Sequence, residues 1–136
     1  MGIRYEWGDK QELILNFYIE YPWTWAEYHE KIDEMMPILA DLGRPCASVV
    51  DCTNLRSLPK DSQFLTVLMN TQKRMPDNLF ASAVVAAPYI VTVFLNMLTQ
   101  LRPDAERLML FAHTQEEAYT KIYARYNELY SGSDQV

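Results

Sequence analysis

Three side chains of this sequence are of the types that together catalyse acyl transfer: a serine, a histidine and a carboxylate. Asp51 ends the apolar run CASVVD, Ser62 follows the polar loop after it, and His113 follows a later apolar run. In such sites the histidine takes the proton of the serine, and the carboxylate orients the histidine. The G-x-S-x-G turn that presents the nucleophile in α/β hydrolases is absent from the sequence. A hydrolase using these residues is therefore the third of the three functions that we consider.

The loop between Asp51 and Ser62 is also suited to a phosphorylation switch. Polar and charged side chains fill this loop, among them Thr53, Asn54, Arg56, Lys60 and Asp61. A phosphate on Ser62 would meet the positive end of the following helix and the nearby cations, so Ser62 is a candidate phosphoacceptor. The alternative is that Asp61 or Ser62 only begins that helix.

Metal-ligating residues do not cluster in the sequence. His29 and His113 lie far apart, and neither a Cys-x-x-Cys nor a His-x-His spacing occurs, so we expect no metal site and no cofactor. Cys46 and Cys52 fall in one predicted strand region, where extended chain separates them by roughly 20 Å, too far for a disulfide. We expect two buried free thiols, as is usual in a reducing cytoplasm.

The elements that must position these residues begin with a hairpin and a helix. Residues 3–7 and 13–19 are β-branched and aromatic runs separated by a Gly-Asp turn, which predicts two antiparallel strands. Residues 24–43 predict a helix, since they begin with the capping pair Thr24 and Glu27 and end at a glycine. Pro37 removes a backbone hydrogen bond inside this helix and predicts a kink or a break there.

From residue 46 onward, predicted strands and helices alternate. The strands are 46–51, 79–87 and 106–112, and the helices are 59–75, 88–101 and 114–130. The order β-β-α-β-α-β-α-β-α predicts an α/β fold, with a mostly parallel five-stranded sheet, an antiparallel edge strand and four helices. We expect one domain over residues 1–130 and a flexible C-terminal tail over residues 131–136.

Composition favours a single globular domain and argues against nucleic-acid binding and against a transmembrane segment. The chain has 136 residues, 49% of them hydrophobic, and a net charge of −6 from 12 basic and 18 acidic residues. Because Lys73 and Arg74 form the only adjacent basic pair, nucleic-acid binding is disfavoured. The most apolar stretch, residues 89–101, is shorter than the roughly 20 residues that cross a bilayer, and the N-terminus lacks a signal-peptide pattern. We therefore expect a cytoplasmic protein without a transmembrane segment.

The order of elements, the opening hairpin, SVVDCTNL at the end of a strand and EEAYTKI in the last helix together resemble the STAS superfamily. This superfamily is typified by anti-sigma-factor antagonists, and the resemblance is to its SpoIIAA-like members, from about Ile3 to Tyr126. It implies a non-enzymatic regulatory domain that acts by protein-protein contact, is often phosphorylated at the start of the second helix and sometimes takes a nucleotide or lipid-like ligand. Of the family's functional residues, the resemblance carries over only Asp51 and Ser62, since Lys60-Asp61-Ser62-Gln63 replaces an Asp-Ser-Ser-Gly turn.

Ligands of an open parallel sheet bind at the carboxyl ends of its strands. In the predicted fold this edge brings together the loop after the strand 46–51, the turn before the helix 88–101 and the end of the strand 106–112. We therefore predict a ligand or partner loop formed by Asp51, Thr53, Asn54, Lys60, Asp61, Tyr89 and His113.

Two surfaces predict contact with a partner. Tyrosines recur every three or four residues along the last helix, at Tyr119, Tyr123, Tyr126 and Tyr130, and either edge the core or form an interface. The helix 88–101 is apolar almost all round, so another subunit or a lipophilic ligand must cover its second face, which includes Phe94 and Met97. The leading hypothesis is therefore a protein-contact domain that forms a homodimer. The alternative is a small-molecule or lipid-binding domain with an apolar pocket between the helix 88–101 and the sheet.

Overall fold

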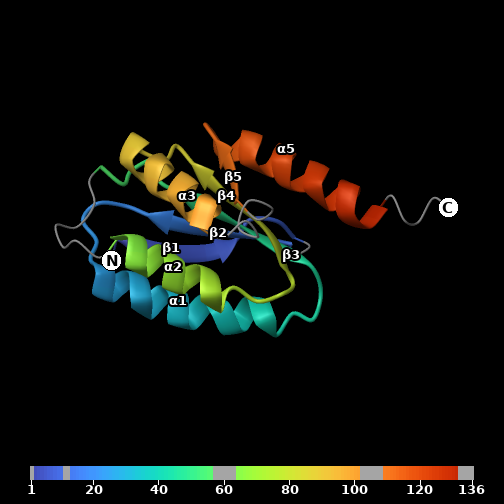
Figure 1. Cartoon of the computed structure of the whole chain (residues 1–136). Helices are drawn as coiled ribbons and strands as arrows, with labels where there is room; N and C mark the ends of the chain where they lie inside the picture. The colour runs from blue at the N-terminus through green and yellow to red at the C-terminus, as the bar shows by residue number, and fades with distance from the viewer. Residues whose placement is uncertain (1, 11–12, 57–63, 102–108, 132–136) are drawn as a thin grey trace.

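A five-stranded mixed sheet forms the centre of the computed structural model, which describes residues 2–10, 13–56, 64–101 and 109–131. The strand order is β1-β2-β3-β4-β5. β1 and β2 pair antiparallel, whereas the other neighbouring strands pair parallel, as the ribbon in Figure 1 shows. The predicted α/β fold class, with its antiparallel edge strand and four α-helices in the described part of the chain, is confirmed.

The described elements agree closely with the predicted ranges. The strands are β1 Ile3–Trp7, β2 Ile14–Ile19, β3 Cys46–Asp51, β4 Leu79–Val85 and β5 Met109–Ala112. The helices are α1 Trp25–Ala40, α2 Phe64–Arg74, α3 Tyr89–Leu101 and α5 Gln115–Tyr126, the last of which continues as a π-helical turn, Asn127–Ser131.

Helix α1 ends at Ala40, before the predicted end at Gly43, and two further boundaries differ from the prediction for local reasons. β4 ends two residues earlier than predicted, because Ala86 has a φ of 55° and turns the chain out of the extended conformation. The predicted tail begins at Ser131, but Ser131 belongs to the π-helical turn, and residues 132–136 lie outside the described part. No helix among the described residues is both long enough and apolar enough to cross a membrane.

Helix α1 runs through Pro37 without interruption to Ala40, so of the two predicted outcomes a break is wrong. The carbonyl of Pro37 still accepts from the backbone N–H of Asp41 at 2.9 Å, which keeps the last turn closed. At the other end, the Oγ1 atom of Thr24 accepts from the N–H of Glu27 at 3.1 Å, as the capping pattern predicts. The carboxylate of Glu27 also accepts from the N–H of Ile3 at 3.1 Å and thereby ties α1 to β1.

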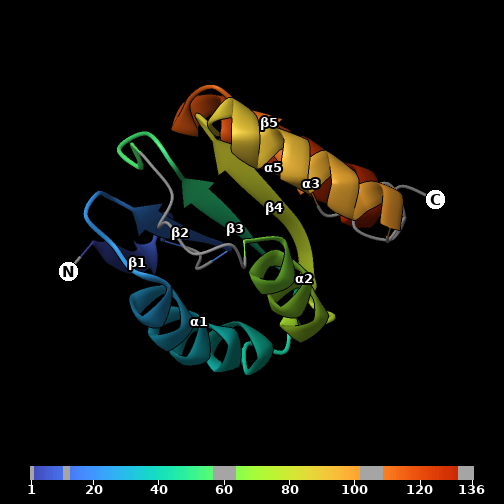
Figure 2. The ribbon, with the colours of Figure 1, turned by 60° about the vertical axis from the view of Figure 1, so that its left-hand side comes forward.

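The two faces of the sheet are covered differently. Right-handed crossovers between successive parallel strands place α1, α2 and α3 on one face, and α1 and α2 lie side by side there in Figure 2. No strand follows α5 in the described chain, and α5 packs on the opposite face, against a separate buried cluster. The buried residues of this second cluster include alanines, whose small side chains let α5 lie close to the sheet: Ala47, Ala81, Ala83, Ala112 and Ala118.

The tyrosines of α5 reach from this second cluster to the opening hairpin. The hydroxyl of Tyr119 donates to Oδ1 of Asn16 at 3.0 Å, and that of Tyr123 donates to Oδ2 of Asp9 at 3.2 Å. The other oxygen of Asp9 accepts from the N–H groups of Leu13 and Ile14. One carboxylate therefore closes the hairpin loop and anchors the C-terminal helix.

Replacement of Gly8 by alanine tests the contact between Tyr119 of α5 and Asn16 of β2. The added Cβ would overlap the hydroxyl oxygen of Tyr119 and lie 2.6 Å from Nδ2 of Asn16, so we expect a loss of roughly 1–3 kcal/mol in the free energy of unfolding. Urea denaturation measures it. The double variant Gly8→Ala/Tyr119→Phe should recover part of the loss, because the clashing oxygen is gone. An equal loss in both variants would contradict the proposed clash.

Candidate ligand-binding pocket

A partly open cavity of about 110 Å³ lies between the sheet and the helices α1, α2 and α3. Its lining residues include Phe17 from β2, Tyr28 from α1, Val84 from β4, and Val91 and Leu95 from α3. All five side chains are buried. The cavity is the place where α3 faces the sheet, which is where the sequence predicts an apolar pocket.

Aromatic rings form the wall of the cavity on the α1 side. Trp23 and Trp25 meet edge to face with centroids 4.9 Å apart. Trp25 and Tyr28 do so at 5.6 Å, and Phe17 and Tyr28 at 6.1 Å. Edge-to-face packing is a favourable geometry for aromatic pairs, because the positive ring edge meets the negative ring face. The rings thus support one another and leave an apolar surface toward the cavity.

Two hydroxyl pairs are the main polar features of the lining. Ser48 on β3 and Ser82 on β4 lie in register, and the hydroxyl of Ser48 donates to that of Ser82 at 2.9 Å. Across the cavity, the hydroxyls of Tyr28 and Thr71 are also 2.9 Å apart. Each pair joins two different elements, so the hydroxyls fix the distances between the walls of the cavity.

No charged side chain is among the described residues that line the cavity. The described lining includes a potential nucleophile, the thiol of Cys52. Burial, and to a smaller extent the nearby carboxylate of Asp51, raises the pKa of this thiol to about 12. A thiol must ionise to attack a substrate or bind a metal. The arrangement therefore supports binding of an apolar molecule better than chemistry on it.

The loop after β3 contributes to the cavity through residues that the sequence prediction did not select. The predicted Thr53 and Asn54 are exposed, and Asp51 accepts from the N–H of Thr53 at 2.9 Å and from its hydroxyl at 2.6 Å. Cys52 and Leu55, by contrast, are buried and line the cavity. Their apolar character within a polar loop is the signal that could have identified them.

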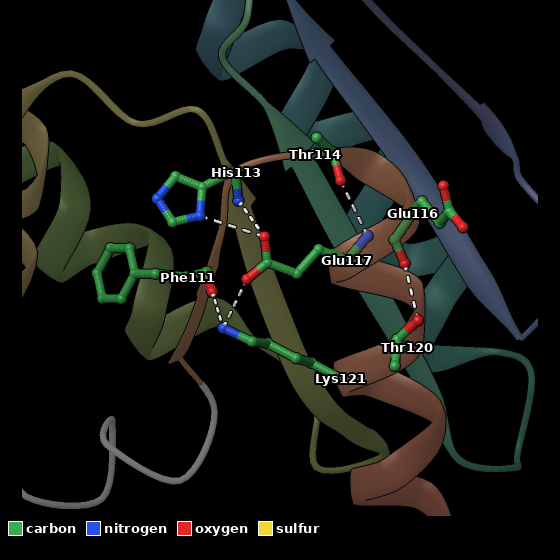
Figure 3. A network of polar contacts seen from close by, with 7 residues as sticks. All are labelled: Phe111, His113, Thr114, Glu116, Glu117, Thr120 and Lys121. Carbon is green, nitrogen blue, oxygen red and sulfur yellow. Dashed lines mark hydrogen bonds and ion pairs between the residues drawn. The ribbon is translucent and has the colours of Figure 1, made fainter.

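His113 lies at the predicted sheet edge but is 94% exposed at its side chain. Its backbone N–H donates to Oε2 of Glu117 at 2.9 Å. Nζ of Lys121 donates to the carbonyl of Phe111 and forms an ion pair with Glu117, as Figure 3 shows. The N–H of His113, followed by Lys121, holds the pKa of Glu117 below its ordinary value. A hollow of about 300 Å³ beside this network is lined by His113, Lys121 and Thr92.

The remaining predicted site residues are only partly placed. Lys60, Asp61 and Ser62 lie outside the described residues, so the phosphoacceptor and the Ser-His-acid site stay predictions. Tyr89 is 84% exposed at the start of α3. The described cysteines, histidines and carboxylates include no group of three or more that could hold a metal ion.

The predicted interface residues differ in their surroundings. Tyr119, Tyr123, Tyr126 and Tyr130 are all half-buried against their own sheet. The rings of Tyr126 and Tyr130 each lie 5.7 Å from that of Phe80. Met97 is 43% exposed on α3, and Phe94 belongs to the same helix, although its side chain is outside the described part. An interface at either surface stays a prediction.

The thiol of Cys52 provides a chemical test of this environment. In the folded protein we expect little alkylation of Cys52 by iodoacetamide at pH 8, because the thiol is buried and its pKa is about 12. Unfolding in urea should make it react readily. Mass spectrometry of a labelling time course measures both rates, and Cys46, whose pKa burial raises to about 11, should behave in the same way. Rapid labelling of folded Cys52 would contradict the described burial.

Comparison of the chain with protein-family models, with curated proteins and with solved structures finds no match.

Proposed function

We propose that this domain binds a small apolar molecule in the cavity between the sheet and the helices α1, α2 and α3, and that it acts through this binding without catalysing a reaction. The observation that supports the proposal is the cavity itself, with its aromatic wall and its uncharged lining. An engineered apolar cavity of about 150 Å³ binds benzene, so a cavity of about 110 Å³ that is partly open suits a ligand built around one ring or a short chain.

The energetics of packing also favour an occupant. Protein interiors are close-packed, and at about 24 cal/mol per Å³ an enclosed void of about 110 Å³ destabilises a fold by roughly 2–3 kcal/mol, which is an upper bound for this partly open cavity. A bound apolar ligand restores the missing contacts and removes its own surface from water. The folded state is therefore expected to be more stable with ligand than without it.

A second candidate function is regulation by protein contact, as the resemblance to STAS domains implies. Tyr89 and Met97 are large apolar residues of α3 that are exposed, at 84% and 43%. On its inner side the same helix lines the cavity with Val91 and Leu95. In this proposal α3 is the contact surface of a homodimer, and Ser62 is its phosphorylation site. The two free cysteines favour a cytoplasmic location.

Filling the cavity tests the first proposal. Toluene should bind the wild-type protein and raise its free energy of unfolding by roughly 1.4 kcal/mol at ten times the Kd. In Val91→Phe the new ring occupies the cavity, so we expect at least about tenfold weaker binding. Saturation-transfer NMR and thermal denaturation measure the two effects. Met97→Phe adds a similar ring on the exposed side of α3 and should bind as the wild type does; unchanged binding in Val91→Phe would exclude this cavity.

The contact function predicts a dimer that depends on the exposed side of α3. Sedimentation equilibrium of the wild type at about 100 µM should give the mass of two chains. Met97→Lys should shift the dimer equilibrium at least about tenfold toward the monomer, since a buried unpaired ammonium opposes association. Lys73→Ala, an exposed change on α2, serves as the control. A monomeric wild type would remove the homodimer.

A further inference from the structure

The floor of the cavity carries two hydroxyl groups where an apolar surface is expected. Ser48 and Ser82 are 4% and 3% exposed, and both line the cavity. Val50 and Val84 also line it from the same two strands and are apolar. Because buried polar groups need hydrogen-bond partners, the serine pair is a specific polar point in an otherwise apolar floor.

One proton of this pair has no acceptor among the described residues. A hydroxyl has one donor and two acceptor sites, and Ser48 uses its proton on Ser82. The pair then retains the proton of Ser82, and neither hydroxyl makes another side-chain hydrogen bond among the described residues. The pair of Tyr28 and Thr71 is different, since Thr71 is partly exposed, and water can accept its remaining proton.

Trp23, a residue of the lining, carries a second donor that lacks a partner among the described residues. The indole Nε1 of Trp23 is buried and has no hydrogen-bond partner within the described chain, and Trp23 is 9% exposed. Both deficits concern donors. A complementary ligand therefore brings a hydrogen-bond acceptor to the cavity.

The acceptor must also be neutral. No lysine, arginine or histidine is among the described residues that line the cavity, so a buried carboxylate or phosphate would have no counter-charge. Carbonyl oxygens of ketones, aldehydes and esters combine strong acceptance with the absence of charge and of N–H or O–H groups.

We infer that the natural ligand is a small, neutral carbonyl compound and that the pair of Ser48 and Ser82 donates a hydrogen bond to its carbonyl oxygen. This inference rests on the proposed function, because it identifies the chemical class of the molecule in the same cavity. The aromatic wall provides the contact for the apolar part of the molecule, and the serine pair sets the position of its oxygen.

Two ligands of nearly equal shape test the inference. Acetophenone carries a carbonyl where α-methylstyrene carries a CH₂ group. Titration calorimetry or tryptophan fluorescence gives Kd for both with the wild type and with Ser48→Ala/Ser82→Ala. Removing both hydroxyls leaves no unpaired partner behind, so the double variant is expected to fold. It should weaken acetophenone binding about tenfold and leave α-methylstyrene binding unchanged or tighter.

The two ligands differ in their affinity for water, and this difference cancels only when the ratio of their Kd values is compared between two proteins. Only the change of that ratio between the proteins is therefore interpreted. Lys73→Ala, an exposed change on α2 outside the lining, should keep the wild-type ratio. An unchanged ratio in the serine double variant, with both ligands bound, would overturn the carbonyl assignment and leave the cavity function intact. Binding of neither ligand to the wild type would overturn the proposed function itself. Benzoate binding as tight as that of acetophenone would contradict the requirement for neutrality.

A spectroscopic measurement on the wild type does not depend on the folding of any variant. The infrared carbonyl stretch of acetophenone moves to lower frequency when its oxygen accepts a hydrogen bond. Bound acetophenone should show this shift relative to acetophenone in an alkane. A stretch at the alkane position would show that no donor reaches the oxygen and would overturn the inference.

Discussion

The sequential strand order is the constraint on which the rest of this structure depends. When each parallel strand lies beside its predecessor, right-handed crossovers place all the connecting helices on one face. Three helices then share that face, whereas α5 alone covers a separate cluster on the other. The packing problem is different on the two faces, and the side chains differ accordingly.

On the α5 face, alanines in three strands and in the helix bring the backbones close, and a rim of tyrosines completes the contact. On the face of α1, α2 and α3, large rings fix the outer wall while the sheet beneath carries valines and two serines. Rings that support each other edge to face cannot collapse into the remaining space without losing their own contacts. The cavity and the rigidity of its wall therefore have the same origin.

The fold could be predicted from the sequence because its signals are local. Trp25, Tyr28, Ile32 and Leu39 are spaced as on one helical face, and all four are buried on α1. The capping pair Thr24 and Glu27 marks a helix start that the structure confirms. The cavity was predicted only by its location beside α3. Periodicity tells which side chains are buried, but whether buried side chains fill the space between them depends on their shapes and on helix positions. The pairing of Ser48 with Ser82 likewise required the register of two strands 34 residues apart.

The tyrosine contacts of α5 have a consequence for the order in which the protein folds. Tyr119 meets Asn16 across 103 residues and Tyr123 meets Asp9 across 114, so the contacts of the opening hairpin are completed only after α5 has been synthesised. Contacts between residues so distant in sequence form late and slow the folding of a domain. Until α5 has been synthesised, the alanine-rich side of the sheet lacks the cover that this helix provides in the folded protein.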